Sequence, residues 1–114
     1  MGSSPRMNTQ SVEDMAGMFR GCNGLNSLDL SNFDTRNVRY IRLIFKDCSS
    51  LRYLDLSSFN LCNLVSSYEL ETMFDGCDSL EKVIVPKDVK TREMLLEALE
   101  YSVGPTKYSS IDIT

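Results

Sequence analysis

Two kinds of side chain in this sequence could do chemistry, and both recur at a fixed distance along the chain. Cys22, Cys48 and Cys77 follow one another at 26 and 29 residues, and Asp29 and Asp55 are 26 residues apart. Thiols can bind a metal ion, form a disulfide or lie reduced in a core, and paired carboxylates can hold a cation or share a proton. The sequence has no His, which excludes Ser-His-Asp and Cys-His catalysis.

The recurrence extends to whole segments and indicates an internal repeat. Residues 18–33 read MFRGCNGLNSLDLSNF, residues 44–59 read IFKDCSSLRYLDLSSF, and residues 73–85 read MFDGCDSLEKVIV. A weaker copy begins the chain, because residues 7–12 align with residues 33–38. We therefore expect a flexible lead-in at 1–6, a repeat region at 7–85 with a partial first repeat and units near 15–40, 41–69 and 70–85, and a C-terminal cap at 86–114.

Each unit combines a strand pattern with a helix pattern. Leu25, Leu28 and Leu30 follow the LxxLxL spacing of a short strand whose alternate side chains enter a core. Ahead of each strand, apolar residues at steps of three, four and seven predict a short helix, with Ser11 and Asn37 as N-caps. One such unit cannot bury its own apolar side, so the copies must stack. The sequence predicts an α/β fold, a short right-handed leucine-rich-repeat solenoid with a parallel sheet backed by short helices.

Residues 86–114 depart from the repeat and are expected to close the stack with a helix. Thr91 is expected to cap a helix over residues 92–102, and Gly104 with Pro105 to end it. Residues 108–113 alternate weakly and could form a final edge strand. A longer helix with one apolar stripe and a charged back is typical of a capping unit.

The run from Met18 to Val38, MFRGCNGLNSLDLSNFDTRNV, closely resembles the BspA-like leucine-rich repeat of bacterial surface proteins, the 26-residue type common in mycoplasma lipoproteins. The resemblance covers roughly residues 7 to 85. It implies a surface-displayed or secreted scaffold used in adhesion or protein binding. It implies no catalytic residue and no cofactor.

The repeat also favours structural explanations for the cysteines and aspartates. One Cys per unit at the same turn predicts a buried ladder of thiols, with a disulfide or a metal site as alternatives. A zinc site would have only the odd Cys62 to add as a fourth cysteine ligand. Asp29 and Asp55 share one outward position in successive strands, so we expect a solvated polar ladder. A cation site, or an acid–base pair in which one pKa is raised, is the alternative.

The outward positions of the three strands form the candidate partner-binding surface, because repeat scaffolds of this kind bind through the exposed side of the sheet. Tyr53 lies at its centre and is flanked by Arg52 and Lys82, which are side-chain types found in interaction hot spots. The candidate residues are Ser27, Asp29, Arg52, Tyr53, Asp55, Lys82 and Ile84.

One basic cluster lies in the second repeat and comprises Arg36, Arg39, Arg42 and Lys46. A phosphate or anionic-surface site is conceivable there. A solvated helix face is the simpler expectation, since no aromatic residue or Gly-rich loop accompanies the cluster.

Charge and hydropathy narrow the class of partner. The 114 residues include 12 Lys and Arg against 16 Asp and Glu, a net charge of −4, which argues against nucleic acid and anionic membranes. No segment approaches the roughly 20 apolar residues of a membrane span, so we expect no membrane insertion. The N-terminus lacks the apolar stretch of a secretory signal. A cytoplasmic location is therefore the alternative to the cell surface.

These observations predict a non-enzymatic module that binds a protein or a surface ligand through the sheet, without a cofactor. The alternative is an intracellular interaction or inhibitor protein on the same scaffold. A metal-dependent hydrolase that uses Asp29 and Asp55 is a distant third. Because the sequence opens in mid-repeat, we expect either a homodimer or missing repeats to cover the strand at residues 25–31.

Overall fold

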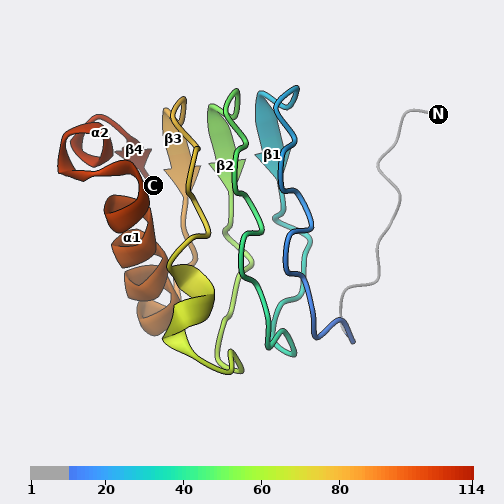
Figure 1. Ribbon diagram of the computed structural model, residues 1–114. Helices are drawn as coiled ribbons and strands as arrows, with labels where there is room; N and C mark the ends of the chain where they lie inside the picture. The colour runs from blue at the N-terminus through green and yellow to red at the C-terminus, as the bar shows by residue number, and fades with distance from the viewer. Residues whose placement is uncertain (1–10) are drawn as a thin grey trace.

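The computed structural model describes residues 11–114, so the expected lead-in at 1–6 and the start of the partial repeat lie outside the described residues. Four parallel strands lie side by side in the order β1 (Ser27–Asp29), β2 (Tyr53–Asp55), β3 (Lys82–Ile84) and β4 (Asp112–Ile113) (Figure 1). The helices are η1 (Ser67–Leu70), α1 (Val89–Val103) and α2 (Pro105–Ser109). The expected α/β class with a parallel sheet is confirmed.

Each repeat strand directs its middle side chain into the core and its outer two away from it. Leu28, Leu54 and Val83 are paired in register, and Val83 pairs with Ile113 of β4. Leu54 and Val83 are buried, whereas Leu28 in the edge strand is half-buried. Neighbouring strands lie about 4.8 Å apart, so equivalent residues of successive repeats sit beside one another.

Aromatic rings and thiols form two columns across the repeats. The ring centroids of Phe19 and Phe45 are 6.1 Å apart and those of Phe45 and Phe74 are 5.7 Å apart, with both pairs stacked. The Cys48 thiol donates to the Phe19 carbonyl at 3.1 Å, and the Cys77 thiol donates to the Phe45 carbonyl at 3.1 Å. Equivalent residues of the three repeats therefore lie next to one another, as the 26- and 29-residue spacing predicts. The insertion before the third repeat does not disturb this arrangement.

The expected helices ahead of β1 and β2 do not form, and the expected N-cap roles of Ser11 and Asn37 are therefore wrong. Both segments are runs of turns. Positive φ angles at Gly17 (67°), at Gly21 (74°), and at two non-glycine residues, Leu43 (62°) and Asp47 (62°), interrupt each segment every four residues. An α-helix needs negative φ throughout, so the apolar spacing here belongs to a different backbone.

Hydrogen bonds in these turn segments alternate between the same repeat and the next one. The N–H groups of Met18 and Cys22 donate three residues back, to the carbonyls of Met15 and Phe19 (both 3.2 Å). The N–H groups between them donate instead to the following repeat at 2.8–3.0 Å: Met15 to Tyr40, Gly17 to Arg42, Phe19 to Ile44 and Gly21 to Lys46. Each repeat thus satisfies backbone donors of the previous one, which a helix cannot do because its N–H groups are used internally.

A buried glutamate compensates for the three-residue insertion in the third repeat. Glu69, in η1, is 5% exposed, and its Oε1 accepts from the N–H groups of Ile41 (2.9 Å) and Arg42 (3.1 Å). In the first repeat the matching N–H group, that of Met15, donates to a backbone carbonyl. The carboxylate therefore takes the place of the carbonyl that the insertion displaces, and the Arg42 guanidinium lies 3.8 Å from its other oxygen.

The C-terminal segment forms the expected helix and edge strand, with a different cap residue. Helix α1 begins at Val89, and its N-cap is Asp88 rather than Thr91. The Asp88 carboxylate accepts from the Thr91 N–H (3.0 Å) and hydroxyl (2.8 Å). Thr91 is 2% exposed, and its hydroxyl accepts from the Leu61 N–H at 3.1 Å, which ties the helix to the second repeat. Gly104, with φ 87°, ends α1. Helices α1 and α2 both lie at the β4 end of the sheet (Figure 1).

Candidate functional site

Outward side chains of the four strands form two rows across the sheet, which we call the outer sheet face. One row runs Ser27, Tyr53, Lys82 and Asp112, and the other runs Asp29, Asp55 and Ile84. All seven predicted residues are here or beside it, since Arg52 directly precedes β2. The parallel register brings together the residues that the repeat alignment predicted to be neighbours.

Ion pairs compensate both cations of this face. Arg52 contacts Glu81 through its Nε (2.9 Å) and its terminal nitrogen (2.8 Å), and Lys82 lies 3.9 Å from the Asp112 carboxylate. Sequence reasoning omitted Asp112, because the weak alternation of residues 108–113 indicates a strand without specifying its pairing partner. Four carboxylates therefore stand on or beside this face against two cations, which leaves it acidic.

The two aspartates serve the turns that follow their strands. Asp29 Oδ1 accepts from the Ser31 N–H and Asp55 Oδ1 from the Ser57 N–H, both at 2.9 Å. The hydrogen bonds from Ser31 hold the pKa of Asp29 below its usual range. This lowering is opposite to the raised pKa that a proton shared between two carboxyls would give one of them. Within residues 11–114 no three His, Cys, Asp or Glu side chains gather closely enough to hold a metal ion.

Tyr53 is the aromatic residue of the outer sheet face. It is half-buried between Ser27 and Lys82 in its row. No residue of the described part of the chain makes a hydrogen bond to its hydroxyl. The Tyr53 side chain thus offers apolar ring surface and an uncommitted hydroxyl at one position of a rigid sheet.

The cysteines form the expected ladder. All four are free thiols; Cys48 and Cys77 are buried, Cys22 is half-buried and Cys62 is exposed. Burial raises the pKa of Cys48 and raises that of Cys77 to about 12, so both thiols are protonated at neutral pH. A protonated, buried thiol that donates to a carbonyl is a packing residue, because reactivity requires the thiolate.

The basic cluster is dispersed by partners of its own. Arg36 pairs with Asp34 at 2.7 Å, Arg42 with Glu69, and Arg39 lies over the Tyr40 ring with 5.7 Å from its guanidinium carbon to the ring centroid. The helix face that was expected to align these cations does not exist. Three of the four cations of the cluster are therefore engaged by groups of the chain itself.

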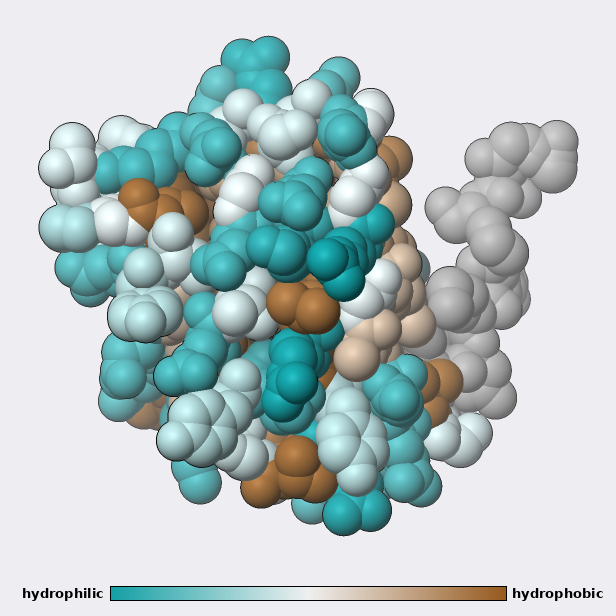
Figure 2. All heavy atoms as spheres, in the orientation of Figure 1, coloured by the Kyte–Doolittle hydropathy of each residue, from teal (hydrophilic) through white to brown (hydrophobic). Residues whose placement is uncertain are grey.

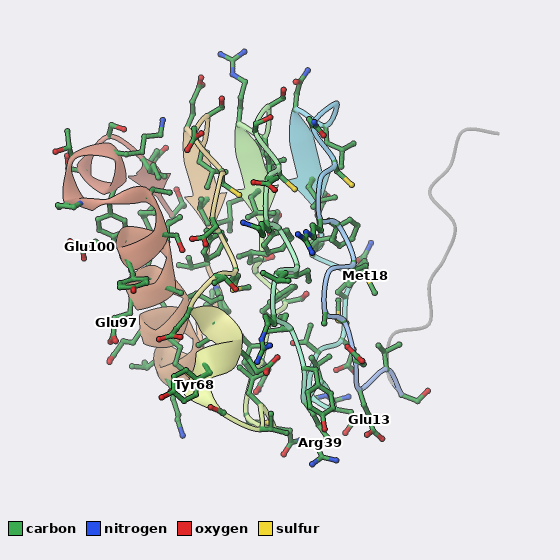
Figure 3. All side chains as sticks on the ribbon, viewed as in Figure 1. Glu13, Met18, Arg39, Tyr68, Glu97 and Glu100 are labelled. Atoms are coloured by element: carbon green, nitrogen blue, oxygen red, sulfur yellow. The ribbon has the colours of Figure 1, made fainter. Side chains whose placement is uncertain are left out.

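Hollows of the described surface lie away from the outer sheet face. One, of about 390 Å³, is lined by Ser11, Glu13, Asn37, Arg39 and Asn63, near the side chains labelled at the bottom of Figure 3. Another, of about 370 Å³, lies between η1 and α1 and is lined by Ser67, Leu70, Glu71, Met94, Glu97, Ala98 and Tyr101. Neither of these two hollows is lined by a candidate residue of the outer sheet face. No helix within residues 11–114 has the length and apolarity needed to cross a membrane.

Comparison with known proteins gives a family and no individual relative. The family described as "Mycoplasma protein of unknown function, DUF285" matches residues 4–101, which include the three repeats and most of α1. Neither curated proteins nor solved structures yielded a match. Because the matched region covers most of its length, the chain belongs to the DUF285 family of mycoplasma proteins of unknown function.

Proposed function

We propose that this chain is a short right-handed leucine-rich-repeat solenoid of the BspA-like type that binds a protein or a surface ligand through the outer sheet face. The stacked phenylalanines, the parallel register and the hydrogen bonds passed from repeat to repeat support the solenoid. Parallel strands joined by crossovers are right-handed in nearly all proteins. The DUF285 family is itself associated with BspA-like repeats.

The observation that carries the binding role is the register that sets Tyr53 between Ser27 and Lys82. Side chains from three strands form a rigid patch, so little conformational entropy is lost when a partner docks on it. A tyrosine with an uncommitted hydroxyl beside compensated ion pairs has the character of an interface centre with a polar rim. The excess of carboxylates favours a partner with Lys or Arg opposite Asp29 and Asp55.

The proposed role is non-enzymatic and places the protein at the cell surface or in secreted form, as the family resemblance implies. The carboxylates that an enzyme would use are engaged in turns, which supports binding over catalysis. Four free thiols favour the second candidate, an intracellular interaction or inhibitor protein on the same scaffold, because disulfides are rare in reducing compartments. Fractionation of the source cells with an antibody against the protein separates the two locations.

Capture of binding proteins on immobilised protein tests the sheet-face role. Tyr53→Ala should abolish the enrichment of a specific partner, and Arg52→Ala should weaken it. Tyr101→Ala is the matched control, since Tyr101 is 74% exposed on α1 and its loss removes an equivalent side chain elsewhere. A partner retained equally by Tyr53→Ala and by the unmodified protein would refute this surface.

A further inference from the structure

We infer that the N-terminal end of the stack is a docking face for one more repeat of the same class, and that a second copy of this chain does not fit it. This inference rests on the repeat architecture proposed above but not on binding through the outer sheet face. The face combines incompletely buried side chains with a row of four backbone carbonyls in its turn segment.

The apolar side chains of this face are half-buried, whereas the equivalent side chains of the second repeat are fully buried. Phe45, Cys48, Leu51 and Leu54 of the second repeat are all 0% exposed. Their counterparts in the first repeat pack against the core but stay half-buried: Phe19, Cys22, Leu25 and Leu28, together with Met18 and Phe33. Figure 2 shows apolar atoms along the β1 edge, where Figure 3 places Met18. Among residues 11–114, this face therefore lacks the contacts that each later repeat receives from the repeat before it.

The turn segment of this face presents a row of backbone acceptors. In the second repeat, the carbonyls of Tyr40, Arg42, Ile44 and Lys46 accept from the first. The first repeat has the same backbone, with positive φ at Gly17 and Gly21 where the second has Leu43 and Asp47. Its matching carbonyls therefore point away from the second repeat; they belong to Asp14, Ala16, Met18 and Arg20. No group in residues 11–114 donates to these four carbonyls.

This polarity identifies the occupant. A row of carbonyls needs a row of N–H groups, and the side of a repeat that faces its successor presents such a row, as Met15, Gly17, Phe19 and Gly21 do. A repeat stacked ahead of the first one would supply these donors, cover Phe19 and Leu28, and pair with the free edge of β1. The occupant thus repeats an interface that the chain already contains.

A second copy fails in both orientations. Two copies related by a two-fold axis would bring carbonyl row against carbonyl row, leaving buried acceptors without donors. A head-to-tail copy would have to offer the donor side of its third repeat, but α1 packs against η1 at that end and covers it. The homodimer expected as one alternative is thereby disfavoured.

Duplication of one repeat tests the fit, with Cys22 as the reporter. A chain that runs from residue 1 to 40 and then from 15 to 114 places a copy of residues 15–40 ahead of the original. The duplicated chain also carries two substitutions, Cys62→Ala and, in the outer copy alone, Cys22→Ala. The inner Cys22 is then the one cysteine that is not fully buried in the unduplicated structure, so it reports whether the outer copy docks. Its labelling should slow roughly tenfold or more relative to the unduplicated Cys62→Ala chain, because docking buries it.

The control carries Phe19→Asp and Leu28→Asp in the outer copy, and its inner Cys22 should label at the unduplicated rate. Unslowed labelling of the inner Cys22 with the outer copy intact, or failure of the duplicated chain to fold, would overturn the inference. Sedimentation of the unmodified chain gives an independent check. We expect a monomer whose Cys22 labels at a concentration-independent rate, and a dimer that protects Cys22 would overturn the inference as well. Tyr53→Ala should leave every one of these rates unchanged, so the sheet-face proposal stands or falls separately.

Discussion

At the scale of single residues, the turn segments depend on backbone conformations that side chains oppose. A Cβ added at Gly76, where φ is 80°, would lie 2.5 Å from Asp47 Oδ1 and 3.0 Å from Asp47 Cα. Asp47 itself has a positive φ of 62°, which L-residues with a Cβ adopt at a cost. The contact between the second and third repeats is thus tight because one of the two residues is glycine.

We therefore predict opposite effects at the two positions. Gly76→Ala should lower the free energy of unfolding by about 2 kcal/mol or more, because the methyl group meets backbone that cannot move independently. Asp47→Gly should raise it by about 0.5 kcal/mol, since glycine accepts positive φ. Gly24→Ala is the control, as a Cβ there meets no atom within 4 Å. Urea unfolding measures all three, and equal losses for Gly76→Ala and Gly24→Ala would contradict the explanation.

The buried thiol of Cys77 makes the free energy of unfolding depend on pH in the alkaline range. Burial raises the pKa of Cys77 to about 12, while an unfolded thiol ionises near its reference value of 9.0. The native state therefore holds a proton that the unfolded state releases. This contribution is complete below pH 9 and is lost as the pH rises toward 12.

The free energy of unfolding should accordingly fall more steeply with pH above 9 in the unmodified protein than in Cys77→Ala. The limiting slope from one thiol is about 1.4 kcal/mol per pH unit. Cys62→Ala should keep the slope of the unmodified protein, because Cys62 is exposed. Denaturant titrations at several pH values provide the measurement. Identical slopes in all three proteins would show that Cys77 does not carry the effect.

At the scale of elements, the C-terminal helix is held by polar contacts as well as by its apolar side. The Thr91 hydroxyl donates to Asp88 and accepts from the Leu61 N–H. In the first repeat the hydroxyl of Thr35 plays the matching part for the Asn60 N–H at 2.8 Å. Two adjacent N–H groups of the second repeat thus donate to threonine hydroxyls on its two sides, Asn60 to Thr35 of the first repeat and Leu61 to Thr91 of α1.

Thr91→Val removes this hydroxyl at nearly constant shape. We expect a loss of about 2 kcal/mol, because the buried Leu61 N–H is left without an acceptor. Thr106→Val on the exposed part of α2 should change stability by less than about 0.5 kcal/mol. The comparison uses urea midpoints with unchanged slopes. A Thr91→Val midpoint equal to that of Thr106→Val would mean that α1 is held by apolar contact alone.

The elements also show why sequence reasoning succeeded for the strands and for the C-terminal helix but failed for the helices expected ahead of β1 and β2. The alternation of Leu28 and Leu30 has a period of two, which only a strand satisfies, and the repeat spacing then fixed the pairing. Apolar residues at Met15, Met18 and Phe19 fit an α-helix and equally fit successive turns whose free N–H groups are satisfied by the next repeat. Gly17 and Gly21 hinted at the turns, but the second repeat has Leu and Asp there, which hid the signal.

At the scale of the whole molecule, the candidate site was as predictable as the register of the sheet. Ser27, Tyr53 and Lys82 fall in one row because each occupies the same position within its repeat's LxxLxL-type motif. The ion pair of Lys82 was not predictable, because it depends on Asp112, in a two-residue strand whose partner no periodicity specifies. The sequence likewise could not show that Glu69 would turn inward to replace a carbonyl, since a charged residue in an insertion is ordinarily solvated.

The loss of unfolding free energy caused by the same substitution should also depend on which repeat of the stack carries it. Phe45 is 0% exposed and stacks on both Phe19 and Phe74, so Phe45→Ala should cost about 3–5 kcal/mol. Phe19 stacks on Phe45 alone among these rings and remains half-buried, so Phe19→Ala should cost about half as much. Urea unfolding followed by circular dichroism and by Cys48 labelling gives both values. If Phe19→Ala proved as costly as Phe45→Ala, the first repeat would already be covered in solution, and the open end inferred for this molecule would be occupied.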